Sequence, residues 1–337
     1  MAVFFVNHKS MIWEEDGFGQ HYVALAYFGK WGREIIKNIF VYRTFEIPLW
    51  DFSIGYGSDI LTTLHYYVIG DPLNLLSIAV PSTYTEYLYG ILIVIRLYFA
   101  GISFSLYCFE MQKSNRAALA GTFNYVFCSY MLYGVYRHPF FINPMIYLPL
   151  LLIGAERIFR KEKSAFFSVM VFLSAVSNFY FFYMIVFAVC CYVVVRFFTL
   201  EHEHFGKELF WILLKFAGYA CIGVCMAAFI LLPVILQFFG TSRMDVSQQH
   251  AAFYSADWYK NFFGYLMSPR KLGEWTNLGF TAPAVLAVLV LFGKRKQHRA
   301  LKVSFLIFTG MLWIPFFGKA LNGFSYVSNR WGGFMQD

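Results

Sequence analysis

Long apolar runs alternate with short polar segments along most of the chain, from residue 91 onward. A bilayer core of ~30 Å needs ~20 helical residues to cross it, and we interpret each run as a crossing. The run at 165–198 is too long for one crossing and is interrupted only at Ser177 and Asn178, so we divide it there. The pattern predicts about eight transmembrane segments, at residues 91–109, 117–134, 140–155, 165–177, 178–198, 209–239, 276–292 and 301–317.

The remaining polar segments define the other parts of the chain. Residues 1–90 are predicted to form a first loop outside the bundle, and the apolar spacing at 22–40 indicates an amphipathic helix on the membrane surface. Residues 1–6 are too short to span, so we expect the first transmembrane helix to be largely missing. The other divisions are a bundle at 91–317, a polar loop within it at 241–275, and a polar segment at 318–337 that we expect to be truncated.

Composition supports a helical membrane protein. Hydrophobic residues make up 59% of the chain and charged residues 14%, whereas a soluble domain has roughly 45–50% and 25%. The apolar runs are continuous and do not alternate with polar positions, which disfavours a β-barrel. We therefore predict an all-α polytopic membrane protein.

Charge predicts which loops share a side. The net charge of +8 comes from basic residues gathered in short clusters between apolar runs, a pattern of cytoplasmic loops and not of nucleic-acid binding. The acidic first loop and the later polar segments then face outward, so we expect a multi-pass protein whose active face is extracytoplasmic. The predicted cytoplasmic loops are 110–116, 156–164, 199–208 and 293–300.

A cluster of carboxylates stands near the start of the chain, at Glu14, Glu15 and Asp16. Asp16 could act as a general base, and with Glu15 in support it could bind Mg²⁺ or Mn²⁺, because carboxylates are the hard oxygen ligands that these ions prefer. The alternative is a solvated loop whose negative charge favours the start of the following helix. Two further carboxylates, Asp51 and Asp59, flank a Gly-x-Gly turn and could be secondary ligands or acceptor contacts, or belong to a purely structural turn.

Two cationic positions are candidates for binding a lipid-linked phosphate. Arg137 and His138 lie in a very short predicted outer loop, close to the headgroup plane, where a guanidinium and an imidazole suit a phosphate. The alternative is an arginine that extends to the interface beside a helix end. Arg96 lies within a predicted span, which makes it a functional candidate, although it could instead pair with Glu86 or Glu110.

The last polar segment combines amides, an arginine and aromatic rings that could hydrogen-bond to a sugar or stack on its face. Its alternative is an aromatic belt at the membrane interface. The candidate sugar or acceptor contacts are Asn322, Tyr326, Arg330 and Trp331, together with Gln20 and His21 near the start of the chain.

Several short motifs follow one another in order: Asp16-Gly17 with Gln20-His21-Tyr22, Trp50-Asp51 with Ile54-Gly55 and Gly57, Tyr66-Tyr67 with Asp71-Pro72, His138-Pro139-Phe140, and Asn322-Gly323 with Ser325-Tyr326 and Asn329-Arg330-Trp331. In this order and spacing the chain resembles the bacterial YfhO membrane proteins, which look like members of the GT-C class of glycosyltransferases. The resemblance implies a GT-C-like bundle, a polyprenyl-phosphate sugar as donor, and a catalytic acidic residue in the first outer loop, which by position is Asp16.

These expectations converge on sugar transfer at the outer leaflet of a bacterial cell membrane. In family terms the acceptor is a cell-wall polymer such as a teichoic acid. A different class remains open, a lipid or polysaccharide transporter in which the same carboxylates bind substrate without chemistry. A transporter should carry ionisable residues deep in several spans, whereas Arg96 and Lys215 are nearly the only ones here, which favours the enzyme.

Overall fold

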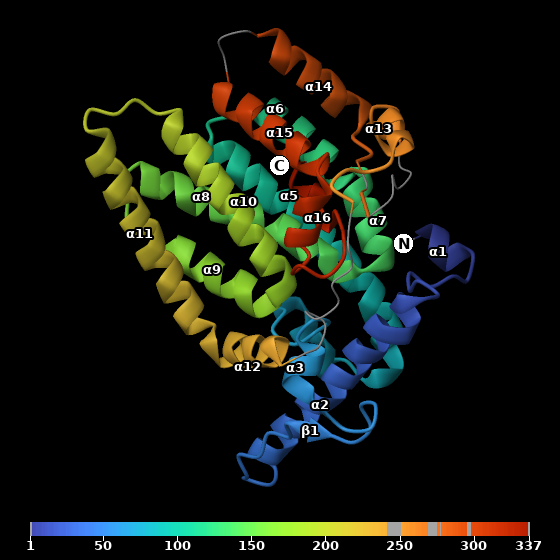
Figure 1. Ribbon diagram of the computed structural model, residues 1–337. Helices are drawn as coiled ribbons and strands as arrows, with labels where there is room; N and C mark the ends of the chain where they lie inside the picture. Colours follow the sequence, from blue (N-terminus) through green and yellow to red (C-terminus); the bar gives the residue numbers. More distant parts are fainter. Residues whose placement is uncertain (1, 241–250, 269–274, 277, 295–297, 336–337) are drawn as a thin grey trace.

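The computed structural model describes residues 2–240, 251–268, 275–276, 278–294 and 298–335, and in these ranges the protein is almost entirely helical (Figure 1). One antiparallel hairpin pairs β1 (Trp50–Asp51) with β2 (Ser58–Asp59). The first part of the chain forms α1 (Ala2–Val6), η1 (Gly17–Tyr22), α2 (Val23–Phe40), α3 (Ile60–Leu64), η2 (Pro72–Leu75), α4 (Leu76–Ala79) and η3 (Ser82–Tyr84). The bundle that follows contains α5 (Thr85–Glu110), α6 (Asn115–Val126), α7 (Ser129–Arg137), η4 (Pro139–Ile142), α8 (Asn143–Phe159), α9 (Ala165–Ser177), α10 (Phe179–Phe198), α11 (Phe205–Met226), α12 (Ala228–Phe239), α13 (Ala256–Phe262), α14 (Ala282–Gly293), α15 (Arg299–Leu312), α16 (Pro315–Ala320) and η6 (Arg330–Met335).

Four helical stretches in the described part of the chain are long and apolar enough to cross a membrane. The predicted all-α membrane class is therefore confirmed, and three shorter apolar helices, α9, α12 and α14, accompany the long ones. The four stretches are Ser82–Glu110, Pro139–Phe159, Phe179–Phe198 and Phe205–Met226.

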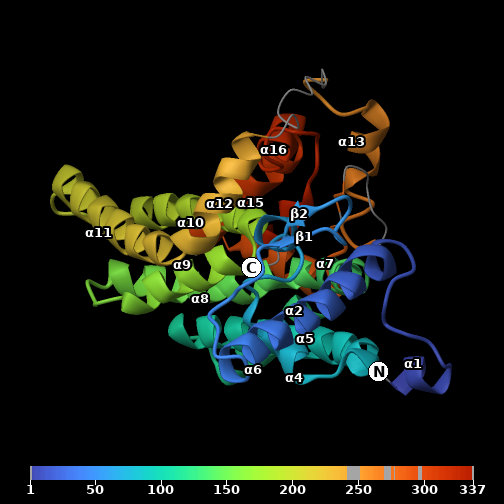
Figure 2. The ribbon, with the colours of Figure 1, turned by 90° about the horizontal axis from the view of Figure 1, so that it is seen from below.

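Helix α8 is the centre of the bundle. Its stretch is 83% buried, whereas that of α11 is only 11% buried and faces outward along one side. Helix α8 packs against α5, α9 and α10, and Figure 2 shows it between a layer holding α5 and α6 and a layer holding α10 and α15. Two apolar cores meet on it, because Leu148, Leu151 and Leu152 belong to one core and Met145 to the other.

The helix break predicted between 165 and 198 is confirmed at Asn178. The Asn178 side chain accepts a hydrogen bond from the Phe181 amide at 3.1 Å and thereby caps α10. Its amide group donates to the Tyr66 carbonyl at 2.7 Å, so the same residue also ties the bundle to the first part of the chain. The amphipathic helix predicted at 22–40 is likewise present as α2.

Three other predicted spans are wrong as single helices. The run at 117–134 breaks at Cys128, where the backbone turns extended and the next amide, of Ser129, bonds to the Gly279 carbonyl. The run at 209–239 breaks at Ala227 between α11 and α12. The run at 301–317 breaks because Ile314 precedes Pro315 and is forced into an extended conformation.

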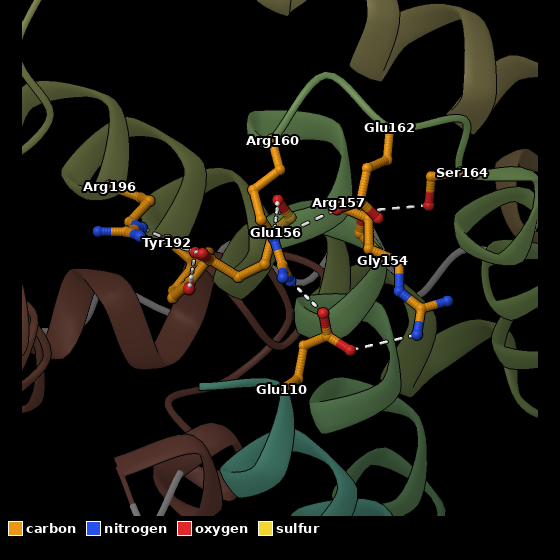
Figure 3. Close-up of polar contacts among 9 residues, drawn as sticks. All are labelled: Glu110, Gly154, Glu156, Arg157, Arg160, Glu162, Ser164, Tyr192 and Arg196. Atoms are coloured by element: carbon orange, nitrogen blue, oxygen red, sulfur yellow. Dashed lines mark hydrogen bonds and ion pairs between the residues drawn. The ribbon is translucent and has the colours of Figure 1, made fainter. Parts of the chain in front are cut away.

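Polar contacts gather at two opposite ends of the bundle. Segments predicted to lie outside, including the first loop, the 135–139 turn and the C-terminal segment, meet at one end. At the other end, shown in Figure 3, Glu110 pairs with Arg157 and Arg160. There the buried Glu156 accepts hydrogen bonds from Tyr192 at 2.5 Å and from Arg196 at 2.7 and 3.0 Å. Two of the predicted basic loops, at 110–116 and 156–164, therefore begin close together.

Candidate functional site

The acidic stretch near the start of the chain leads into η1 and then α2. Asp16 is half-buried, while Glu14 and Glu15 are exposed. The Asp16 carboxylate accepts a hydrogen bond from the Gln20 side-chain amide at 2.8 Å. The side-chain oxygen of Gln20 in turn accepts one from the Tyr67 hydroxyl at 2.9 Å. Asp16 is therefore joined through one amide to the aromatic pair Tyr66–Tyr67, which the motif order also contains.

Two imidazoles form the centre of this end of the bundle. His21 Nε2 and His138 Nδ1 lie 2.7 Å apart, and both residues are buried. The Tyr67 ring packs on His21 with ring centroids 5.6 Å apart, and Phe140 contacts both imidazoles. The structure thus brings together His21 and His138, which are separated by 117 residues along the chain.

The environment of the pair keeps both rings neutral. Burial lowers the pKa of His21 to about 4. Burial also lowers the pKa of His138 to about 3, with the neighbouring His21 and then the positive charges of Arg330 and Arg137 acting in the same direction. One proton is shared along the His21–His138 hydrogen bond, and the tautomers decide which ring donates it.

Two arginines are held beside His138 by aromatic rings. The Arg137 guanidinium lies 4.5 Å from the centroid of Trp13 and 4.6 Å from that of Tyr133. The Arg330 guanidinium lies 4.8 Å from the centroid of Trp275, and its Nη2 donates to the Tyr326 hydroxyl at 2.9 Å. Trp13 and Trp275 both contact the His138 ring, each with centroids 5.7 Å away.

Neither arginine pairs with a carboxylate within the described ranges. Arg330 Nε is buried and has no hydrogen-bond partner there. A buried guanidinium nitrogen without an acceptor is costly, so this geometry suits an anion that supplies one. Planar guanidiniums bind phosphate oxygens well, and the rings fix their orientation without neutralising their charge.

Trp275 is a member of this group that the sequence did not identify. It adopts a left-handed backbone conformation, with φ of 60°, which is uncommon for a non-glycine residue. Such strain persists only where surrounding contacts fix it, and here the indole contacts both Arg330 and His138. The available signal was a lone tryptophan in a polar loop just before an apolar run.

The C-terminal segment is packed into the bundle. Asn322 is buried, accepts a hydrogen bond from the Tyr180 hydroxyl at 2.6 Å, and donates to the Tyr326 carbonyl at 2.9 Å. Trp331 has no exposed surface, so its ring is not available to a ligand in this structure. Tyr326 is exposed and, with Arg330, forms the accessible part of the segment.

The carboxylates of the hairpin have structural partners. Asp59 accepts hydrogen bonds from the Thr62 amide and hydroxyl, both at 2.7 Å, and so caps α3. Asp51 accepts from the Tyr27 hydroxyl at 2.6 Å and from the Ser53 amide at 2.7 Å. The structure does not bring either one into contact with Asp16, and the turn between them matches the structural alternative.

Arg96 does not pair with Glu86 or Glu110, so that prediction is wrong. Its partner is Asp71, with Arg96 Nη2 and Asp71 Oδ2 at 2.7 Å and both side chains almost completely buried. Glu86 is exposed, and Glu110 lies at the far end of α5, where it binds Arg157 and Arg160. The Asp71-Pro72 turn enters the bundle from the first loop, which sequence spacing alone did not indicate.

Mg²⁺ or Mn²⁺ would need several oxygen ligands at Asp16. The described residues contain no group of three or more His, Cys, Asp or Glu side chains placed to hold a metal ion. Asp16 instead bonds to Gln20. The residues do not fit a bound divalent ion, and we derive no step through one.

The helical bundle and its long apolar helices define an all-α membrane protein. The chain belongs to the family described as bacterial membrane protein YfhO, whose model matches residues 1–332. A curated relative, the uncharacterized protein YfhO of Bacillus subtilis (strain 168), is 29% identical over 218 residues. The aligned part is 60% of this chain and 23% of the relative, so the chain spans about a quarter of that protein's length. No solved structure matches the chain.

Proposed function

We propose that the protein is a GT-C-type inverting glycosyltransferase, with about eight transmembrane segments, that transfers a sugar at the outer leaflet from a polyprenyl-phosphate donor. The observation that carries the proposal is the pair of arginines, Arg137 and Arg330, held on aromatic rings with no carboxylate partner in the described residues. The donor's phosphate would lie between them, beside His138. The acceptor would be a cell-envelope polymer such as a teichoic acid.

The chemistry follows from the charges. Asp16 accepts the proton of an acceptor hydroxyl, and the hydroxyl oxygen forms a bond to the anomeric carbon of the sugar. The bond from that carbon to the phosphate oxygen breaks, and its electron pair stays on the departing polyprenyl phosphate. Arg137 and Arg330 stabilise that negative charge in a site shielded by Trp13 and Trp275. Positioning and charge neutralisation are the main demands, because phosphate is a good leaving group.

Other residues position these groups. Gln20 bridges the Asp16 carboxylate and the Tyr67 hydroxyl and so fixes the position of the carboxylate. Tyr326 is exposed beside Arg330 and would contact the sugar or acceptor. The apolar outer surface of α11 would face lipid, with the two polar ends of the bundle on opposite membrane faces.

The test is sugar transfer in membranes that contain the full-length protein, with a radiolabelled polyprenyl-phosphate sugar and an acceptor polymer. Wild type should label the polymer, and Asp16→Asn should reduce the rate by at least about 100-fold, the scale of general-base catalysis. Glu15→Gln is the matched control, because its carboxylate is adjacent but exposed. Wild-type rates in Asp16→Asn would refute the catalytic role, and lipid movement across vesicles without transfer would favour the transporter.

A further inference from the structure

A cavity extends from His21, one member of the histidine pair, to Arg96, one member of the buried ion pair. Its lining includes His21, Tyr67, Asn74, Tyr89 and Arg96, together with Phe140 and other apolar side chains. Two polar atoms on residues that line it, His21 Nδ1 and the Tyr89 hydroxyl, are buried and lack a hydrogen-bond partner in the described structure. His21 is 5% exposed and Tyr89 is 4% exposed.

Buried polar atoms without partners are rare, because each costs about 1–3 kcal/mol. A tyrosine hydroxyl can donate or accept, so through one ordered water in the cavity it can serve His21 Nδ1 in either tautomer. Arg96 and Asn74 already have partners, since Arg96 Nη2 bonds to Asp71 and Asn74, both at 2.7 Å. The cavity is therefore equipped to satisfy the inner nitrogen of the histidine pair.

The neutral and the protonated histidine pair need different hydrogen-bond partners at their outer nitrogens. A neutral pair has one outer nitrogen that donates and one that accepts. A protonated pair shares one proton in the His21–His138 bond and carries protons on both outer nitrogens, His21 Nδ1 and His138 Nε2. It is stable only if both find acceptors, and the cavity offers one at the His21 end through Tyr89.

We propose that a phosphate group bound by Arg137 and Arg330 draws one proton from solvent onto the His21–His138 pair, with the Tyr89 cavity accepting the hydrogen bond of the inner nitrogen. This inference rests on the phosphate position of the proposed function. The phosphate oxygen accepts from His138 Nε2, so a bound phosphodiester and the protonated pair together carry no net added charge.

The charges around the pair support this coupling. With no anion bound, the nearest unpaired charges at His138 are the two arginines, and they oppose its protonation. An anion between them reverses that effect, whereas the Arg96–Asp71 pair is internally neutral and contributes little net field. The titratable and charged groups around the pair are Tyr67, Tyr89 and Arg96 in the cavity lining and Arg137 and Arg330 at His138. Beyond them, Asp71 pairs with Arg96, and Asp16 bonds to Gln20.

The affinity of the site for a phosphate should depend on pH. The free protein holds the pKa of His21 at about 4 and that of His138 at about 3, and the bound anion raises the pKa of the pair. Affinity therefore tightens as pH falls through the pKa of the complex, by at most about tenfold per pH unit for one proton.

Isothermal titration calorimetry with farnesyl methyl phosphate tests the coupling, because a phosphodiester keeps one fixed charge between pH 5 and 8. Titrations of the full-length protein in buffers with different protonation enthalpies count the protons taken up. We expect uptake approaching one proton and tighter binding at pH 5.5 than at pH 8. His138→Gln and His21→Gln should abolish uptake, and Tyr89→Phe should reduce it.

His65→Gln is the matched control, because His65 is also a buried imidazole with a pKa lowered by burial to about 4, but it bonds to the Val176 carbonyl. It should keep the wild-type uptake. Binding without proton uptake, or uptake that persists in both His21→Gln and His138→Gln, would overturn the coupling while leaving the phosphate site. No binding at any pH would remove the site and the coupling together, and sugar transfer would be judged separately by labelling.

Discussion

The buried ion pair between Asp71 and Arg96 allows a quantitative test of what holds the first loop to the bundle. Arg96 Nε donates to the Asn143 side chain at 3.1 Å, and its Nη2 donates to both Asp71 and Asn74 at 2.7 Å. Asn143 also donates to Asp71 at 2.8 Å. The network therefore joins the Asp71 turn to α5 and α8, and Arg96→Met would remove its only charged donor.

The loss of stability in Arg96→Met comes from the Asp71 charge that stays buried. Breaking a buried pair by removing one partner costs about 3–5 kcal/mol, because the other charge stays buried and unpaired. After Arg96→Met, the donors left to Asp71 within the described ranges would be the Asn143 amide and the Leu73 backbone amide. Asp71→Asn should cost a similar amount. The double variant removes both charges, so its cost should fall short of the sum of the two singles by about 1–3 kcal/mol.

The measurement is denaturant or thermal unfolding of the detergent-solubilised protein. Arg157→Met is the matched control, since Arg157 pairs with Glu110 but its side chain is 38% exposed. That variant should cost less than about 1 kcal/mol. If Arg96→Met costs no more than Arg157→Met, or if the Asp71 and Arg96 effects simply add, the buried pair does not stabilise the loop.

Three further changes probe the site and its support. Arg330→Lys keeps the charge but loses the planar fork held on its aromatic rings, so the KM for the polyprenyl-phosphate donor in the labelling assay should rise roughly tenfold, and an unchanged KM would contradict donor binding there. Asp59→Ala should lower the free energy of unfolding by about 1 kcal/mol through loss of the α3 cap, whereas Asp59→Asn, which can still cap, should cost only a few tenths. Gly70→Ala should lower the free energy of unfolding by well over about 1 kcal/mol. The reason is that Gly70 has φ of +91° and an added Cβ would lie 1.8 Å from the Val176 carbonyl oxygen. Near wild-type stability of this variant would show that the turn can relax.

The apolar pattern predicted the class of fold well and the helix ends poorly. Hydropathy identifies where the chain enters the membrane, because burial in lipid depends on composition over a long window. Breaks within an apolar run depend on single residues. The break at Asn178 was visible as a polar residue, whereas the one at Cys128 depends on a contact between the Ser129 amide and the distant Gly279 carbonyl.

For charged residues, too, the general placement could be predicted from the sequence, but the individual partners could not. The ends of the 110–116 and 156–164 loops lie together, because Glu110 pairs with Arg157 and Arg160; the grouping of the other basic loops stays a prediction. The alternative partners considered for Arg96 were Glu86 and Glu110, both on the same predicted helix or next to it. The observed partner, Asp71, reaches Arg96 through a turn whose entry into the bundle leaves no local signal. Spacing along one helix can exclude Glu110, four helical turns away on α5, but it cannot supply a partner from another element.

The candidate site combines both kinds of information. Asp16, Gln20 and His21 lie on one short stretch, so their proximity could be predicted from sequence alone. The contact of His21 with His138, and of His138 with the Trp275 ring that carries Arg330, requires the fold to bring the two ends of the chain together. This arrangement changes the functional interpretation of Arg137 and Arg330. Arg137 alone is equally compatible with an interfacial anchor, whereas two arginines on rings that both contact one neutral imidazole pair form a site whose charge is matched only by an anion.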